Sequence, residues 1–554
     1  MPRIVVHVRT DARQQIFDIG SNNINNPAGG ELFEYSARHE EINSDIFAIA
    51  SKKIGDLDIG LTVGNQLNQR FDKFILTRGR DFGVPGFFSL SNVSSFFSDN
   101  IKTERRLAGV FGSLDLGYKN TYYLTVSGRN DWASTFGPQA KSSFFYPSVS
   151  GSVVFSEWLT NKNILSFGKL RLSYARAGRE PFAYSSRTVF TQPFFADGFT
   201  NGIGFPYLGV NGMGISNTLG NAFLRPEIRT SYEAGVDLKF IQNRFTLGLT
   251  YYYDKSTDLL VRRPLASTTG SRSIFSNVGE MENRGYEVEL GADILDEKKT
   301  GFGWNITGNW AQNKNKVLKL AEGVSEISLE NAFTGIGSYA IVGQPYGAFF
   351  GTKWQRDASG ALVIGTNGLP VKDPTNQYIG NPNPKWTAGI RNTFSFKGLS
   401  LTGLLDVREG SSIWGGTIGR LYRIGRLAET ANRAQTFVID GVKADGSKNT
   451  TPISPQAYYG QYLGDNGSAE ETKVYDASWV RLREATLSYT LPKLANWLRN
   501  ATIYATGRNL WLKTDYLGVD PETSLTGAGS QIGGFDYFNM PSTKSLIFGL
   551  RADF

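Results

Sequence analysis

Hydrophobic and polar residues alternate with a period of two along most of this chain. Between residues 110 and 127, Lys119 and Asn120 separate two segments whose apolar positions share one face, namely Val110, Leu114, Leu116, Tyr118, Tyr122, Leu124 and Val126. Because successive side chains of a strand point to opposite faces, the pattern predicts a β-hairpin with one apolar and one polar face. The alternation recurs to the end of the chain and predicts about sixteen strands, each near the ~9–11 residues that a tilted membrane strand needs.

The connections between the predicted strands alternate in length. Short connections are expected near residues 54–56, 119–120, 157–167, 241–243, 295–301, 396–398 and 492–499. Long connections are expected near residues 68–104, 129–146, 177–227, 255–283, 314–384, 409–477 and 512–543. This rhythm is typical of an up-and-down barrel with tight turns on one side of a membrane and long loops on the other, whereas a soluble sandwich has no reason to place every long loop at one end. We therefore predict an all-β chain forming a partial transmembrane antiparallel up-and-down β-barrel.

The amino-acid composition distinguishes between a helical membrane protein and a β-barrel. The 554 residues include 63 glycines and 13% aromatic residues, and no cysteine. No apolar run approaches the ~18 residues of a membrane-spanning helix, which excludes a helical membrane protein, whereas barrel strands average out to mild hydrophilicity. The formal net charge of +8 comes from scattered Lys and Arg without a basic run, so we expect no nucleic-acid partner.

The two ends of the chain carry different signals. The opening MPRIVVHVRTDARQQ has no apolar h-region, so it does not read as a signal peptide, and we expect the chain to be part of a longer protein. The last segment places Leu546, Phe548, Leu550, Ala552 and Phe554 on one face. An alternating final strand with a terminal aromatic residue resembles the signal read by the outer-membrane barrel-assembly machinery, which would recognise it by strand addition. A periplasmic C-terminus would place the long loops outside the cell.

Six blocks of the sequence are distinctive. They lie at residues 104–136, 168–179, 279–290, 380–401, 476–492 and 501–523, and they include NPNPKW and ASWVRLREATLSYTLP. In content and in order, these blocks resemble the C-terminal half of the SusC/RagA-like, TonB-linked outer-membrane proteins of Bacteroidetes. The resemblance implies that residues 1–554 are the C-terminal portion of a TonB-dependent receptor barrel, and that the N-terminal plug domain is not present.

The same resemblance implies a function and a set of partners. Such a protein lies in the outer membrane of Gram-negative cells and actively imports a sizeable nutrient, such as a glycan, an oligosaccharide or a peptide. The expected partners are a SusD-like surface lipoprotein, TonB acting through the missing N-terminal region, the barrel-assembly machinery and outer-membrane lipid. The resemblance implies no enzymatic activity and no cofactor.

Two alternatives stay open at this point. A passive, porin-like pore is one, because an even set of about sixteen strands can close as a porin does. A soluble all-β binding protein or enzyme is the other, and it predicts extraction from cells without detergent. The family blocks favour the importer, and the rhythm of the loops disfavours the soluble protein.

Motifs for catalysis or metal binding are incomplete. The segment HEEIN has Asn43 where a zinc protease of the HExxH type needs its second histidine. Glu287, Glu289 and Asp293 share one strand face, which fits paired catalytic carboxylates, but charges lining a water-filled lumen explain them more simply. We predict no catalytic residue.

The resemblance implies that many relatives carry a calcium-loop-like segment, rich in Asp and Gly, before the NPNPK block. In this chain, residues 357–380 hold that place. Here Asp357 and Asp373 are present, but the close acidic spacing that gathers ~6–8 oxygens around calcium is missing. We predict no metal site.

Ligand contacts are expected from aromatic residues of the long loops. The candidates are Phe87, Phe88, Phe194, Phe195, Trp354, Trp414, Tyr458 and Tyr459. Flat rings can stack on the apolar faces of sugars or hold a partner lipoprotein. The alternative for each single residue is that its ring packs the loops against one another.

Overall fold

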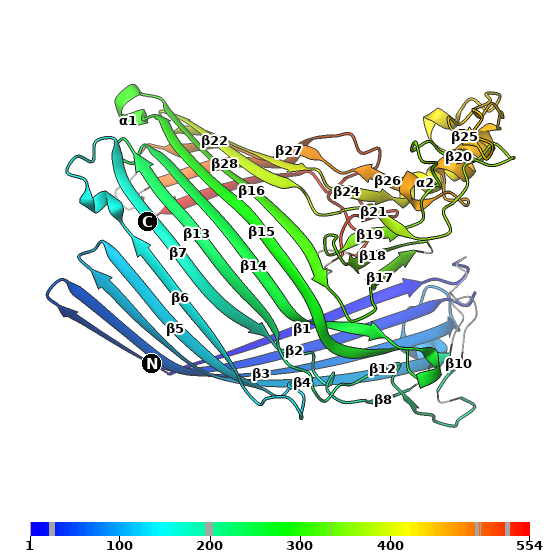
Figure 1. Ribbon diagram of the computed structural model, residues 1–554, viewed down its shortest axis with the longest axis horizontal. Helices are drawn as coiled ribbons and strands as arrows, with labels where there is room; N and C mark the ends of the chain where they lie inside the picture. The colour runs from blue at the N-terminus through cyan, green and yellow to red at the C-terminus, as the bar shows by residue number, and fades with distance from the viewer. Residues whose placement is uncertain are drawn as a thin grey trace. The chain divides into compact units, whose positions relative to one another are not determined.

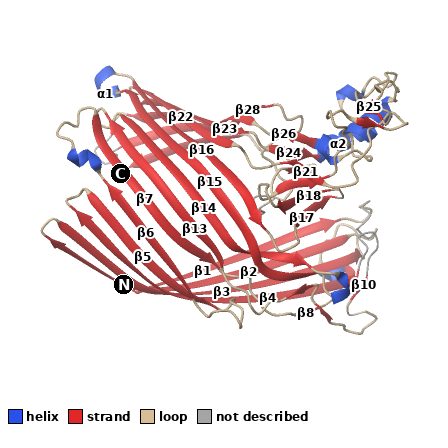
Figure 2. Ribbon diagram, in the orientation of Figure 1, coloured by secondary structure: helices blue, strands red, loops and turns tan. Residues whose placement is uncertain are grey.

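The structure is a computed structural model that describes residues 2–21, 28–192, 194–195, 203–205, 207–333, 335–492, 498, 500–526 and 532–553. Strands dominate these residues, and the helices are short, as Figures 1 and 2 show. Sixteen long strands and the two-residue β12 (Thr218–Leu219) belong to one hydrogen-bonded sheet, which confirms the predicted all-β fold class. Within the described part of the chain, no helix is long and apolar enough to cross a membrane.

The chain divides into two compact units. The first comprises residues 1–152, 173–231 and 256–280, and the second comprises residues 153–172, 232–255 and 281–554. Five long strands contribute residues to both units: β6 (Phe144–Val153), β7 (Leu165–Arg179), β13 (Glu227–Phe240), β14 (Phe245–Pro264) and β15 (Ser273–Leu295).

The first unit is built on a run of long antiparallel strands. They are β1 (Pro2–Phe17), β2 (Glu31–Ile54), β3 (Leu57–Phe82), β4 (Val93–Tyr118), β5 (Tyr122–Ala133) and β6 (Phe144–Val153). From β1 to β5 each strand pairs with the next. Lys119 and Asn120 have φ values of 54° and 53°, the left-handed conformation of the two central residues of a type I′ turn, and the loop from β4 to β5 is three residues long. The predicted hairpin around these two residues is confirmed.

The long connection predicted at residues 68–104 is mostly strand, and this prediction was wrong. β3 continues to Phe82 and β4 begins at Val93, and the two pair along this whole length. Apolar and polar residues do not alternate strictly over residues 68–82, so the pattern alone predicts no strand there. A strand that extends beyond a membrane needs no such alternation, since water solvates both faces while the ladder satisfies the backbone. The connections near 129–146 and 255–283 are shorter than expected for the same reason.

The short segments of the first unit lie between β7 and β13 in the chain. They are β8 (Phe190–Thr191), β9 (Phe194–Phe195), β10 (Ile203–Gly204), β11 (Gly214–Ile215) and β12. β9 pairs with β10 and β11 with β8, both antiparallel, whereas β12 lies parallel to the first residues of β15.

The second unit contains the later strands of the large sheet. They are β16 (Gly303–Lys319), β22 (Trp386–Phe396), β23 (Leu399–Glu409), β27 (Trp479–Leu491), β28 (Asn500–Thr514) and β30 (Ser545–Asp553). Each of these strands pairs antiparallel with the next in this order. The helical turn α1 (Glu297–Thr300) closes the short connection before β16, and it is capped by the side chain of Asp296.

The two faces of this sheet have different chemistry. On the face that we call the apolar face, the register places Leu401 of β23 opposite Leu487 of β27. On the other, the polar face, Thr393, Thr402, Thr486 and Thr506 face one another across β22, β23, β27 and β28. Their hydroxyls lie 3.2 Å apart in the first pair and 2.8 Å apart in the last. The alternation seen in the sequence is therefore the alternation of the strands.

The last strand, β30, has the geometry expected of a barrel-assembly signal. Leu546, Phe548 and Leu550 lie on one face and are largely exposed, and Ala552 continues that face. β30 pairs with β28 along its whole length. Phe554 lies outside the described residues, and the recognition of this strand by the assembly machinery stays a prediction.

Candidate functional site

Three long loops of the second unit fold into one packed substructure, which we call the loop assembly. It comprises residues 320–333, 335–385, 410–478, 515–526 and 532–544, which follow β16, β23 and β28. One small sheet contains β17 (Glu326–Phe333), β18 (Ile336–Ile341), β19 (Ala348–Gly351) and β21 (Gln377–Gly380), and another contains β24 (Ser412–Gly415), β26 (Val474–Asp476) and β29 (Phe535–Asp536). β24 pairs with both β26 and β29, so the second and third loops share a sheet. Figure 1 shows β24 and β26 side by side.

Short elements complete the loop assembly. β20 (Val363–Ile364) pairs parallel with β25 (Val442–Lys443), and α2 (Gly416–Arg423) directly follows β24. A π-helix spans Ala457–Leu463. In Figure 2 the blue helix α2 and the red strand β25 lie in the same small region of the picture.

The loop assembly has its own hydrophobic core, to which all three loops contribute. Its buried members are Ile336, Phe349, Trp414, Ile532 and Phe535. The indole Nε1 of Trp414 donates a hydrogen bond of 2.8 Å to the Glu470 carboxylate. Glu470 also pairs with the buried ammonium of Lys473 at 3.1 Å. Because these buried polar groups are satisfied, the loops form a fixed surface rather than separate flexible segments.

An ionic cluster ties the third loop to the sheet. Arg481 of β27 donates a hydrogen bond of 2.6 Å to Asp520, and both side chains are almost fully buried. Arg483, at a bulge in the same strand, contacts Asp406 of β23 and Glu522 of the loop, each at 2.7 Å. The pairing of buried opposite charges fixes where the third loop leaves the sheet.

The carboxyl group of Asp520 is held in its ionised form. Burial alone raises the pKa of this carboxyl, but hydrogen bonds from Ser542, the backbone N–H of Glu522 and Arg481 outweigh it and lower the pKa below its usual range. Asp520 is therefore a charged anchor at neutral pH.

The structure brings four of the predicted aromatic contacts together in the loop assembly. Trp354 and Trp414 are only 5% and 4% exposed. The Trp354 ring lies 5.9 Å from that of Tyr462, and the Trp414 ring stacks on that of Phe333 at 4.6 Å. Both tryptophans contact side chains of the assembly itself, which supports the packing alternative for them.

Tyr458 and Tyr459 belong to an aromatic stack in the same assembly. The Tyr458 ring lies parallel to that of Phe437 with 4.0 Å between centroids, and the Tyr459 ring lies parallel to that of Tyr422 at 5.8 Å. Burial, followed by a hydrogen bond to Glu429, raises the pKa of Tyr422. Tyr458 and Tyr459 are half-buried, so each keeps an accessible part.

The other four predicted contacts lie in the first unit. Phe87 is exposed, and Phe88 packs edge-on against Phe82 at 5.6 Å. Phe194 and Phe195 form β9, but their side chains lie outside the described residues. Ligand contact by any of the eight aromatic residues stays a prediction.

An exposed aromatic surface that the sequence analysis did not single out lies over Trp414. The Tyr537 ring lies 4.7 Å from that of Phe333 and 4.9 Å from that of Phe538. Phe538 is 57% exposed and has a φ of 55°, and its backbone N–H donates a 2.6 Å hydrogen bond to the Thr417 hydroxyl. We call Phe333, Tyr537 and Phe538 the aromatic step.

The backbone of Phe538 points to a function for the aromatic step. A left-handed conformation is costly for a bulky residue, and such strain is concentrated at functional sites. Here the surrounding hydrogen bonds hold an apolar ring in water. The sequence contains a pattern that could have indicated this surface, since FDYF at 535–538 places three aromatic residues within four positions of a long loop.

The acidic residues considered for metal binding accept hydrogen bonds within local turns. Asp357 accepts hydrogen bonds from the hydroxyl and backbone N–H of Ser359, and these lower the pKa of its carboxyl. Asp373 accepts from Thr375 in the same way. Across the described residues, no group of three or more histidine or acidic side chains is arranged to hold a metal ion.

The carboxylates considered for catalysis lie on the polar face of the sheet. Strand alternation places Glu287 and Glu289 on the same face as Asp293, which accepts a 2.6 Å hydrogen bond from the amide of Asn305. A row of acidic groups along one strand face fits a water-exposed lining better than a catalytic pair.

Comparisons with known proteins agree with this architecture. A model of the family described as TonB dependent receptor-like, beta-barrel matches residues 8–510. TonB-dependent receptor P26 of Formosa agariphila is 29% identical over 509 residues, which cover 85% of this chain and 48% of the relative. TonB-dependent receptor SusC of Bacteroides thetaiotaomicron is 24% identical over 482 residues, which cover 82% and 44%. The chain spans about half the length of these curated relatives.

Solved structures show the same fold. A chain of the RagAB peptide importer in its open-open state superposes with a TM-score of 0.76 at 21% identity, and the match covers all of this chain and 59% of the other. The RagAB peptide transporter gives a TM-score of 0.74 at 20% identity, covering 99% and 59%.

Proposed function

We propose, from the premise that this chain belongs to the TonB-dependent receptor-like β-barrel family, that it serves active import of a sizeable nutrient across the outer membrane. Proteins of this family are outer-membrane transporters and receptors rather than enzymes. The chain supplies the barrel wall and the extracellular loops. TonB would supply the energy for this import.

The observation that carries this proposal is the combination of a polar wall with a rigid loop assembly. The polar face of the sheet presents threonine, asparagine and carboxylate groups, which suit a water-filled passage. The loop assembly presents the aromatic step from a fixed base, so little conformational entropy is lost when a ligand binds.

The proposed substrate class is a glycan, an oligosaccharide or a peptide. The exposed ring of Phe538 and the half-buried ring of Tyr537 can stack on the apolar face of a sugar or on an apolar peptide side chain. The similarity to SusC is to a TonB-dependent receptor whose name gives no substrate, and the fold shared with the RagAB peptide importer supports the peptide class. By the same similarity, we propose that a SusD-like surface lipoprotein covers the loops.

Uptake through the protein is expected to require TonB and the proton gradient. Cells producing the protein are given fluorescent oligosaccharides or a labelled peptide mixture, and uptake is compared with that of a strain lacking TonB. We expect accumulation to fall to the background level without TonB or with an uncoupler. Uptake that persists in both cases, together with leakage of small sugars from liposomes, would identify a passive pore instead.

Phe538→Ala is expected to weaken ligand binding about tenfold, which corresponds to ~1.4 kcal/mol, because an exposed aromatic anchor is lost. The affinity of the purified protein for the transported oligosaccharide or peptide is measured by calorimetry. Met540→Ala is the matched control, since Met540 is 84% exposed on the same loop but carries no ring. Equal affinities for the two variants would exclude the aromatic step from the binding site.

A further inference from the structure

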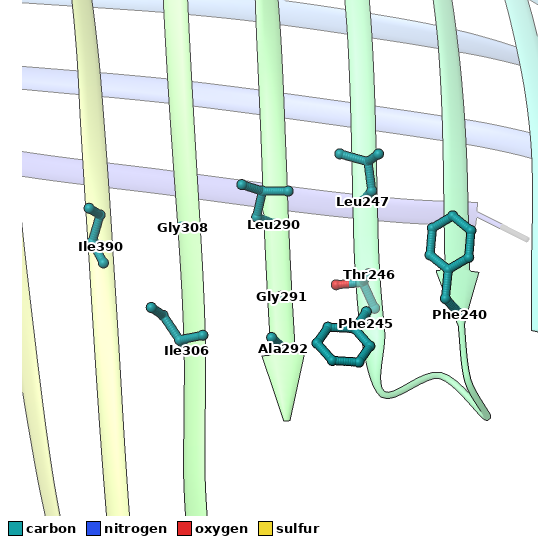
Figure 3. Close-up of a pocket in the computed structure, with 10 residues that line it drawn as sticks. All are labelled: Phe240, Phe245, Thr246, Leu247, Leu290, Gly291, Ala292, Ile306, Gly308 and Ile390. Carbon is teal, nitrogen blue, oxygen red and sulfur yellow. The ribbon is translucent and has the colours of Figure 1, made fainter. Parts of the chain in front are cut away.

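A groove of about 410 Å³ crosses the apolar face of the sheet in the second unit. It is lined by side chains from β13, β14, β15, β16 and β22, as Figure 3 shows. Phe245, Leu247, Leu290, Ile306 and Ile390 provide most of the walls. Its volume lies within the ~300–1,000 Å³ of pockets that hold small organic ligands.

The groove exists because one strand lacks a side chain at this level. Gly308 pairs with Ile390 of β22, and in Figure 3 it lies between Ile390 and Leu290. A Cβ atom at Gly308 would meet only the carbonyl oxygen of Gly389, at 3.6 Å, which is an ordinary contact. The glycine is therefore not required by close backbone packing, and its effect is to leave space on the apolar face.

The chemistry of the surroundings limits what can occupy this space. Water gains no hydrogen bonds from an almost wholly apolar lining. In an outer-membrane barrel the apolar face contacts the hydrocarbon of the bilayer, so the molecules that reach the groove are lipids. An acyl chain is flexible and narrow enough to enter a groove of this kind, whereas bulk lipid covers a flat wall without a fixed position.

A cation lies at one end of the groove. The guanidinium carbon of Arg244 is 5.8 Å from the centre of the Phe245 ring. Its nitrogen atoms donate hydrogen bonds to the backbone carbonyls of Asp293, at 2.6 Å, and Ile294. No carboxylate among the described residues forms an ion pair with this exposed arginine, so its charge is available to an anion.

The geometry points to a binding site for one glycerophospholipid, with an acyl chain in the groove and its phosphate beside Arg244. Arg244 ends the short turn between β13 and β14, at the end of the sheet opposite the long loops. With the long loops outside the cell, this end faces the periplasm, where the leaflet consists of phospholipid. The occupant is thus a phospholipid and not lipopolysaccharide.

Filling the groove is expected to displace the lipid. The protein is purified from outer membranes in a mild detergent, and the lipid that remains bound is measured by native mass spectrometry. Wild-type protein is expected to retain one phospholipid per chain. Gly308→Leu is expected to retain about fivefold less or lower, because its side chain occupies the volume that the acyl chain would fill.

Gly403→Leu is the matched control. Gly403 lies on the apolar face of β23 outside the groove, and a Cβ atom there meets nothing within 4 Å. This variant adds the same apolar side chain to the wall and is expected to retain phospholipid like the wild type. Arg244→Gln is a second test that leaves the groove open, and it is expected to lower retention of phospholipid but not of an uncharged alkyl detergent.

Several outcomes would overturn the site. Equal phospholipid retention by the wild type and Gly308→Leu is one, and co-purification of lipopolysaccharide or of detergent alone is another. Folding of Gly308→Leu is judged by heat-modifiable migration in gels. If this variant does not fold, unchanged phospholipid retention by Arg244→Gln would overturn the site instead. TonB-dependent uptake plays no part in these measurements, so the site and the proposed import are tested separately.

Discussion

Arg481→Met is expected to destabilise the loop assembly by about 3–5 kcal/mol, because it leaves the carboxylate of Asp520 buried without its charge partner. The two side chains are almost fully buried and 2.6 Å apart. The free energy of local opening is measured by hydrogen exchange of the backbone amides in residues 515–526, with the protein in detergent micelles. We expect these amides to lose protection, while those of β28 keep it.

Two further variants separate the buried charge from the loss of a side chain. Arg508→Met removes an exposed arginine that pairs with Glu484 at 3.2 Å, and it is expected to cost at most about 1 kcal/mol. Arg481→Met combined with Asp520→Leu removes both buried charges and is expected to recover most of the lost stability. If the double variant is no more stable than Arg481→Met, the penalty does not come from the unpaired carboxylate.

Acid is expected to release the third loop of the same assembly. The folded structure lowers the pKa of Asp520, so its carboxylate stabilises the folded state at pH values above the pKa of the unfolded chain. This contribution is lost as the pH falls through the lowered folded pKa. Limited proteolysis of residues 515–544 between pH 7 and strongly acidic conditions measures the release. Arg481→Met is expected to move the release toward higher pH.

The period-two alternation of apolar and polar residues, and the tight turns between strands, explain why the wall of the barrel could be predicted from the sequence. One apolar face in contact with lipid imposes strict alternation, and a tight turn such as that at Lys119 and Asn120 separates two strands by only three residues. The extension of β3 to Phe82 could not be predicted in this way, because strands in water on both sides need no alternation.

The positions of the loops that form the loop assembly could be predicted from the sequence, but the pairing of their strands could not. Its strands are two to eight residues long, and several of them pair with strands that are distant in the chain, as with Trp414 of β24 and Phe535 of β29. Local patterns carry no information about such pairs. The aromatic residues were recognised as important, but composition does not distinguish a ring that forms the core, such as Trp414, from one held in water, such as Phe538.

Trp414→Ala tests this distinction and is expected to have the second large effect, a loss of about 3–5 kcal/mol in the stability of the loop assembly. The indole is 4% exposed, stacks on Phe333 at 4.6 Å and donates to Glu470. Its removal leaves a cavity in the core shared by the three loops and a buried carboxylate with one donor fewer. Hydrogen exchange in β18 and β24 is expected to report the loss.

Trp414→Phe separates a structural role of this residue from contact with the ligand. Phenylalanine keeps most of the apolar contact and removes the hydrogen bond to Glu470, so we expect a smaller loss of about 1–3 kcal/mol, the cost of an unsatisfied buried acceptor. Because the ring lies beneath the aromatic step, the affinity for the transported ligand is expected to stay within about twofold of wild type, a difference of less than ~0.5 kcal/mol. A tenfold loss of affinity in Trp414→Phe with the loops still protected would show that Trp414 contacts the ligand directly. In that case the loop assembly would have to open during binding, since the tryptophan is inaccessible in the closed arrangement.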